Sequence, residues 1–273
     1  MRFLHAIITA SAILLMSVAA HAQLPERLDV AYSSQNDGCH INTIEHFSAA
    51  VKAGFNCLKA DMQLTSDGVI VLCHDNGFTF DADGRIGKFD KNHCTPIKTL
   101  SYKKIRKMEY ATGKAFKGEY PKVTTLEELA KFAKKAGVWI YITLRNFNQK
   151  ETLAEVVKVL EKTKMMERTI INNYTPNDDT CTIIRQFLPN VPISYTTTKN
   201  QFINEAFVDN VARFAPVMIC ANRNQIPTPE IVKYMTGKGV RALGWYPNNA
   251  EEYAKWLGIG LTGAQITKRE VIK

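Results

Sequence analysis

Short apolar runs alternate with amphipathic stretches along most of the chain. Eight runs have the length and composition of strands, at residues 28–32, 57–62, 69–73, 139–144, 169–172, 193–196, 217–221 and 242–245. Apolar positions at helical spacing lie between most of them, at 44–53, 126–136, 153–164, 179–187, 203–212, 229–237 and 250–257. The exception is 76–122, a long excursion after the third strand that is rich in Gly, Lys and Asp.

This alternation predicts a parallel sheet built from strand–helix–strand crossovers. Eight such units in one chain of this length favour a closed barrel over an open sheet. We therefore predict an α/β protein, a (β/α)8 TIM barrel in one domain, with a long excursion after the third strand. Two helix starts support the element boundaries: Thr125 with Glu128 three residues later, and Thr228 before Pro229.

The N-terminus has a different character. Arg2 precedes an almost wholly apolar run at 6–18, and Ala20-His21-Ala22 forms a small-x-small cleavage site. This pattern predicts a signal peptide over residues 1–22, a barrel domain over 23–273, and an exported protein, periplasmic or secreted. The alternative is an uncleaved anchor, which the polar start of the following segment disfavours. No second run is long enough to cross a bilayer, so we expect no stable membrane anchor.

The chain has 35 Lys and Arg against 26 Asp and Glu, a formal net charge of +9. A basic balance favours anionic partners such as phosphate esters, lipid headgroups or nucleic acid. We find no nucleic-acid motif, and the lysines read as scattered along helices, so we expect no nucleic-acid partner. Six cysteines include no C-x-x-C pair, and their pairing cannot be read from the sequence.

Polar residues gather where the expected strands end. In a parallel barrel these ends meet at one face, which carries the active site. Lys59 and Asp61 are two residues apart and so face the same way. The candidates for this face are Tyr32, Lys59, Asp61, His74, Asp75, Thr143, Arg145, Asn173, Tyr195, Asn222 and Trp245.

Residues 53–75, A-G-F-N-C-L-K-A-D-M-Q-L-T-S-D-G-V-I-V-L-C-H-D, resemble the signature of the glycerophosphodiester phosphodiesterase family. In that family A-G-A-D leads to E-x-D, then V-x-x-T-x-D-G and V-x-x-H-D. Shorter resemblances occur at 123–128, 244–248 and 260–267, in the family's order. The resemblance implies a barrel that hydrolyses phosphodiesters, with phosphodiesters or phospholipid headgroups as partners. It also implies Ca²⁺ or Mg²⁺ held by three carboxylates, and two histidines as acid and base.

Several positions depart from the family pattern. Tyr32 stands where the family has its first catalytic histidine, and Lys59 and Thr143 stand where it has glutamates. Asp61 and His74 remain. A single carboxylate beside an ammonium group is a poor ligand set for Ca²⁺ or Mg²⁺, so we expect no metal site of the family type.

Two interpretations stay open. In the first, Lys59 and Arg145 bind the phosphate, His74 is the general acid, and Tyr32 or a water replaces the lost base. In the second, a catalytically impaired pseudoenzyme binds an anionic phosphate or sugar phosphate, since losing one acid–base group costs about 10²–10⁴ in rate. Trp245 is a candidate for stacking on glycerol or sugar.

The missing histidine has two further candidates. His40 lies in the first βα loop, whereas His46 follows Glu45 in a helix and is expected to be structural. Two other functions are weighed less heavily: a barrel that holds a sugar or a surface partner, and a related phospholipase D-like or phosphoinositide-cleaving barrel. The lost histidine and carboxylates count against the second of these as well.

Overall fold

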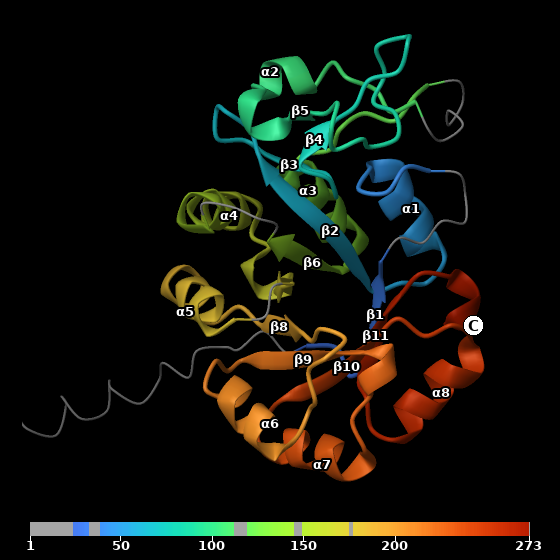
Figure 1. The fold of residues 1–273 in the computed structure, drawn as a ribbon, viewed down its shortest axis with the longest axis vertical. Helices are drawn as coiled ribbons and strands as arrows, with labels where there is room; N and C mark the ends of the chain where they lie inside the picture. The colour runs from blue at the N-terminus through green and yellow to red at the C-terminus, as the bar shows by residue number, and fades with distance from the viewer. Residues whose placement is uncertain (1–23, 33–38, 112–118, 145–148, 175–176, 273) are drawn as a thin grey trace, which may run out of the picture.

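The computed structural model describes residues 24–32, 39–111, 119–144, 149–174 and 177–272 (Figure 1). The expected signal peptide at 1–22 and Arg145 lie outside the described residues. Eight parallel strands form the barrel: β1 (Leu28–Ala31), β2 (Cys57–Leu64), β6 (Trp139–Leu144), β7 (Thr169–Asn173), β8 (Ile193–Thr196), β9 (Val217–Asn222), β10 (Arg241–Trp245) and β11 (Gly263–Ile266). The barrel closes because β1 pairs with both β2 and β11, which confirms the predicted fold class.

Helices cover the outside of the barrel (Figure 1). They are α1 (Ile44–Lys52), α3 (Leu126–Ala136), α4 (Gln149–Thr163), α5 (Asp178–Phe187), α6 (Glu205–Ala212), α7 (Pro229–Gly237) and α8 (Ala250–Gly258), with short 3₁₀ turns η2 (Met166–Arg168), η3 (Arg223–Gln225) and η4 (Arg269–Val271). The predicted capping box is confirmed, because Thr125 Oγ1 accepts from Glu128 N–H and Glu128 Oε2 accepts from Thr125 N–H. Within the described residues, no helix combines the length and the apolar content that a bilayer span requires.

Apolar side chains form separate cores inside and outside the barrel wall. The larger core lies between the strands and the helices and includes Leu58, Ile140 and Ile219. A smaller core fills the barrel and includes Val30, Met218 and Leu243. Alternate side chains of each strand point into one core or the other, because successive residues of a strand face opposite sides of the sheet.

The predicted third strand is a strand but not part of the barrel wall. β3 (Ile70–Leu72) pairs antiparallel with β2. The link between them is a tight turn, in which Thr65 N–H donates to Val69 O at 3.0 Å and Thr65 Oγ1 donates to Asp67 Oδ1 at 2.7 Å. Such a short link suits a hairpin, because a parallel crossover needs a dozen residues or more.

The eighth wall strand is instead β11, which the apolar pattern does not predict. It contains Gly263 and Gln265 and so lacks a continuous apolar run. Gly263 allows a close approach: a Cβ there would lie 2.1 Å from Leu28 O on β1. The backbone of Gly263 also has φ +149°, in the region that favours glycine.

The excursion forms a small lobe at the carboxyl end of β2 (Figure 1). It contains β4 (Gly77–Phe78), β5 (Thr95–Pro96), η1 (Ile97–Thr99) and α2 (Tyr102–Ile105). Its own apolar cluster includes Phe78, Ile97, Ile105 and Tyr110, which pack against Val71 of β3. The lobe is therefore a folded platform attached to the β2–β3 hairpin.

Candidate active site

A pocket of about 170 Å³ lies at the carboxyl ends of β1 and β2. It is lined by Tyr32, Ile41, Asn42, His46, Lys59, Asp61 and His74. Four residues predicted from the sequence therefore meet at one place: Tyr32, Lys59, Asp61 and His74. This is the end of the barrel where TIM-barrel enzymes carry their active sites.

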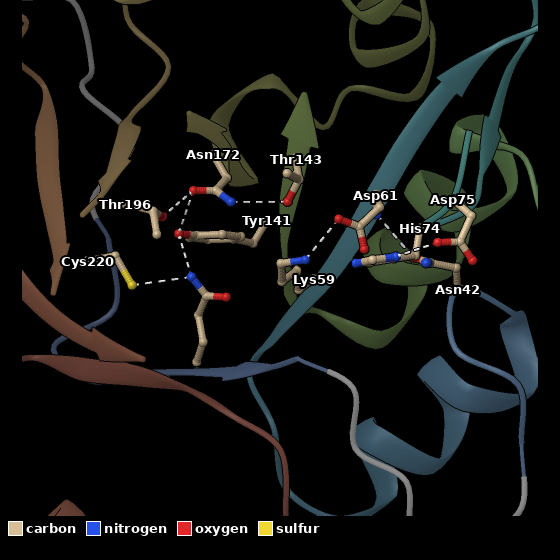
Figure 2. A network of polar contacts seen from close by, with 11 residues as sticks. Asn42, Lys59, Asp61, His74, Asp75, Tyr141, Thr143, Asn172, Thr196 and Cys220 are labelled. Atoms are coloured by element: carbon tan, nitrogen blue, oxygen red, sulfur yellow. Dashed lines mark hydrogen bonds and ion pairs between the residues drawn. The ribbon is translucent and has the colours of Figure 1, made fainter. Parts of the chain in front are cut away.

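Lys59 and Asp61 form a buried ion pair at the base of this pocket. Lys59 Nζ lies 3.0 Å from Asp61 Oδ1, and the two side chains are 4% and 6% exposed. Figure 2 shows them pointing toward each other from β2, as their spacing of two residues predicts. Burying two charges is favourable only when they are paired and well hydrogen-bonded, so the pair needs support from its surroundings.

Asn42 supplies part of that support. Its Oδ1 accepts from the Asp61 N–H at 3.0 Å, which ties the first loop to β2. Asn42 has φ +65°, a left-handed conformation that Asn adopts more readily than most residues. Because Oδ1 is engaged with the backbone, the Nδ2 group is left as a donor for the pocket that Asn42 lines.

Tyr32 packs against the ammonium group of Lys59. Lys59 Nζ lies 4.5 Å from the centroid of the Tyr32 ring, within the range of a cation–π contact. Tyr246 stacks on Tyr32 with ring centroids 6.2 Å apart and an interplanar angle of 14°. Tyr32 therefore forms a wall beside Lys59, and its role as a base stays a prediction.

His74 and Asp75 form a second polar pair at the pocket mouth. His74 Nδ1 lies 3.0 Å from Asp75 Oδ1, and the side chains are 40% and 36% exposed. When Nδ1 carries the proton donated to Asp75, Nε2 is the atom free to exchange a proton with a ligand. A carboxylate that orients an imidazole in this way is a common arrangement for proton transfer.

Two further histidines lie near this region, and only one lines the pocket. His46 of α1 is 2% exposed and lines the pocket, which its helical position alone does not predict. His40 stacks on Tyr110 with ring centroids 3.7 Å apart and is not among the pocket-lining residues. Burial lowers the pKa of His40, while the contact between its Nδ1 and Ile41 O at 2.8 Å and the charge of Asp75 raise it.

A polar network fills the barrel beside Lys59 (Figure 2). Tyr141 is hydrogen-bonded to Asn172 Oδ1 at 3.1 Å and accepts from Gln265 Nε2 at 3.1 Å. Asn172 Nδ2 donates to Thr143 Oγ1 at 3.1 Å. Burial raises the pKa of the Cys220 thiol to about 12, with the Gln265 bond and the Lys59 charge acting in the opposite direction. The ammonium group of Lys59 thus lies close to the interior network.

Trp245 lies in the barrel interior and is not among the residues that line the pocket. It packs against the interior apolar core, and its ring centroid is 6.0 Å from that of Tyr246. Its Nε1 is buried without a hydrogen-bond partner in the described part of the chain. Stacking on a ligand therefore stays a prediction for Trp245.

The pocket does not fit the divalent cation that the resemblance implies. Among the described residues that line the pocket, Asp61 is the single carboxylate, and one of its oxygens is engaged with Lys59. Across the described residues, no group of three or more His, Cys, Asp and Glu side chains is gathered in a way that could hold a metal ion. Ca²⁺ takes six to eight oxygen ligands, and an adjacent ammonium group repels it.

A larger hollow of about 490 Å³ lies elsewhere, beside α3, α4 and the β2–β3 turn. Its charged side chains pair with one another, as Lys131 and Lys162 do with Glu127. We assign the chemistry to the smaller pocket, because it holds the buried cation and the oriented histidine at the carboxyl ends of the strands.

A closed parallel barrel with these groups at the carboxyl ends of its strands has the architecture of a TIM-barrel enzyme. Comparison with known proteins gives the narrower assignment. The chain belongs to the glycerophosphoryl diester phosphodiesterase family, whose model matches residues 32–266.

Individual relatives are distant. The Bacillus subtilis (strain 168) protein YhdW is 25% identical over 230 residues, which cover 81% of this chain and 86% of YhdW. Human glycerophosphodiester phosphodiesterase 1 is 26% identical over 139 residues, which cover 50% of this chain and only 39% of the human protein. A phosphodiesterase of Oleispira antarctica, solved with the product sn-glycerol-3-phosphate, has a TM-score of 0.72 at 16% identity, covering 91% of this chain and 96% of that one.

Proposed function

We propose that this protein binds and hydrolyses glycerophosphodiesters or related small phosphodiesters, with a fixed lysine in place of the family's divalent cation. The observation that carries the proposal is the buried Lys59 ammonium, paired with Asp61 at 3.0 Å in the pocket that His74 also lines. Membership of the phosphodiesterase family supports the substrate class.

Lys59 supplies the positive charge that a phosphodiester requires. A preorganised cation in a site shielded from water stabilises a phosphoryl oxygen more strongly than a cation in solvent does. The Nδ2 group of Asn42 adds a neutral donor to the lining of the same pocket. Asp61 and Tyr32 fix the ammonium group, so it needs no rearrangement when charge develops.

Two proton transfers accompany the displacement at phosphorus. The neighbouring glycerol hydroxyl, or a water, forms a new P–O bond while the P–O bond to the leaving alcohol breaks. His74 donates its proton to the leaving alkoxide. We assign the proton of the attacking hydroxyl to His46, because imidazole titrates near neutrality whereas a tyrosine hydroxyl has an ordinary pKa near 10.

Three sequence predictions enter as parts of this proposal. Arg145, beyond the described residues, would provide a second cation for the phosphate, and Trp245 would contact the alcohol portion. The segment 1–22 would direct export and be removed. Mass spectrometry of the protein from a secreting host tests the last point: a chain that begins at Gln23 is expected, and retention of Met1 would contradict it.

The test is hydrolysis of glycerophosphocholine by the purified protein, with EDTA and with added Ca²⁺ or Mg²⁺. We expect activity that EDTA does not remove and that His74→Ala lowers by about 10²–10⁴. The matched control is His93→Ala, because His93 is also paired with an aspartate but lies in the exposed part of the excursion. Activity that depends on added Ca²⁺ or Mg²⁺ and vanishes in EDTA would overturn the proposal.

The second candidate is a pseudoenzyme that binds an anionic phosphate without turnover. It is favoured by the replacement of the family's first catalytic histidine by Tyr32. Absence of hydrolysis under every condition, together with a rise in melting temperature on adding sn-glycerol-3-phosphate, would support this alternative. Loss of that rise in Lys59→Met would place the ligand in the same pocket.

A further inference from the structure

The positive charge of the chain is concentrated in the excursion. Residues 76–122 contain eleven Lys and Arg and five Asp and Glu, a net charge of +6 out of +9 for the whole chain. The sequence interpretation of scattered lysines is therefore wrong for this segment. Residues 91–108 contain no acidic residue at all.

Five cations of this segment form what we call the basic patch: Lys98, Lys103, Lys104, Arg106 and Lys107. They lie on η1 and α2 and directly after α2, and all five are exposed. None forms an ion pair with another residue in the described part of the chain. Other surface cations that the structure describes on helices do form ion pairs, as Lys255 does with Glu251 and Lys238 with Asp209.

The basic patch is held on a folded support. Ile97 and Ile105, which flank the cations in sequence, are fully buried. Ser66 N–H donates to Leu100 O at 2.9 Å, and Tyr102 N–H donates to Asp67 Oδ1 at 2.9 Å. The patch is thereby fixed to the hairpin that extends β2, the strand that carries Lys59 and Asp61 (Figure 1).

Exposed aromatic side chains occur at the same end of the barrel. Among the described residues, the large hydrophobic side chains that are exposed are Phe80 at 38%, Tyr174 at 43% and Phe202 at 83%. Phe80 belongs to the excursion, and Tyr174 and Phe202 lie in the segments that follow β7 and β8. All three therefore lie on the side of the molecule where the strands end and the pocket opens.

We propose that this end of the barrel docks onto a membrane surface rich in anionic lipids. Cations near such a surface gain about 1 kcal/mol each, and aromatic rings favour the headgroup region. Double-stranded nucleic acid would use the charges alone, whereas lipid also accounts for the exposed phenylalanines; a single strand, which can stack on aromatic rings, is distinguished by the test below. The inference goes beyond the proposed function, because docking does not depend on turnover.

Co-sedimentation with lipid vesicles tests the proposal. The probes are vesicles of phosphatidylcholine alone and of phosphatidylcholine with one-quarter phosphatidylglycerol. We expect binding to the anionic vesicles that 0.5 M salt largely removes, since salt screens exposed charges. Binding to vesicles without anionic lipid is the reference for any binding through the apolar N-terminus, a segment that all variants share.

The key variant replaces Lys103, Lys104, Arg106 and Lys107 by Gln. We expect its partition coefficient on anionic vesicles to fall by roughly a thousand-fold, because four charges at about 1 kcal/mol each lower binding by about fivefold per charge. The matched control replaces the exposed Lys52, Lys135, Lys164 and Lys233 by Gln, with the same change in net charge away from the excursion. A second variant, Phe202→Ser, is expected to weaken binding at unchanged charge.

Three results would overturn the inference: no preference for anionic vesicles, equal losses in the patch variant and its control, or tighter binding of the patch to a single-stranded oligonucleotide than to vesicles. Hydrolysis of glycerophosphocholine in solution is expected to be unchanged in the patch variant. Failure of docking and failure of the proposed hydrolysis are therefore separate outcomes.

Discussion

Replacing Lys59 by Met would test the central feature of the site. The change keeps a long side chain but removes the ammonium group, so Asp61 is left as a buried carboxylate at 4% residue exposure. Asp61 would retain its backbone hydrogen bond to Asn42, which does not compensate its charge. Removing one partner of a buried ion pair is strongly destabilising for this reason.

The magnitude follows from the separation of the two groups. At the observed 3.0 Å between Nζ and Oδ1, Coulomb's law with an effective dielectric constant of about 20 gives roughly 5.5 kcal/mol. Measured losses for breaking buried pairs are about 3–5 kcal/mol. We therefore expect Lys59→Met to lower the free energy of unfolding by about 4 kcal/mol.

Urea denaturation at neutral pH measures this loss. The double variant Lys59→Met with Asp61→Asn removes both charges and is expected to recover at least half of it, because neutral replacements of buried pairs are often tolerated. A loss below about 1 kcal/mol in the single variant would refute the reasoning, since it would mean that Asp61 is well solvated. Equal stability of single and double variants would do the same.

Three further predictions concern the barrel and its loops. Gly263→Ala is expected to lower the free energy of unfolding, measured in urea, by at least about 3 kcal/mol, because its Cβ would meet Leu28 O at 2.1 Å. The control Gly237→Ala has open space around it and should be neutral or stabilising. Similar effects at both sites would argue against the close approach. Tyr141→Phe removes the hydroxyl group that is hydrogen-bonded to both Asn172 and Gln265, and it should lower the free energy of unfolding by about 1–3 kcal/mol. An unchanged midpoint of urea denaturation would show that the network is dispensable for stability. Burial lowers the pKa of His40, so the unfolded chain binds a proton that the folded chain does not, and stability should fall as pH falls through the unfolded pKa near 6.5. His40→Phe should lose less stability than the wild type between pH 7.5 and 5.5, and equal losses would exclude His40 as the cause.

The fold was largely predictable because strand and helix periodicities are local properties of the sequence. The error at residues 69–73 arose because an apolar run does not reveal its pairing direction, which here depends on the short turn at Thr65–Gly68. β11 was not predicted because two of its residues are not apolar. Gly263 allows the close approach to β1, and Gln265 makes a hydrogen bond inside the barrel.

The site was predictable where strand parity or a motif applied. Lys59 and Asp61 lie together because alternate residues of one strand face one side, and His74 followed from the motif. Asn42 and His46 were not assigned to the site, because their approach depends on how α1 packs beside β2. Nothing in the local sequence distinguishes His46 as a residue of the site.

Closure of the barrel depends on strands that lie far apart in the sequence. β1 lies between β2 and β11, so its partners are a strand about thirty residues away and one more than two hundred residues away. The ring therefore cannot form until the last strand has left the ribosome, and such distant pairings slow folding. A chain that ends before Gly263 would expose the open edges of β1 and β10 together and is expected to aggregate.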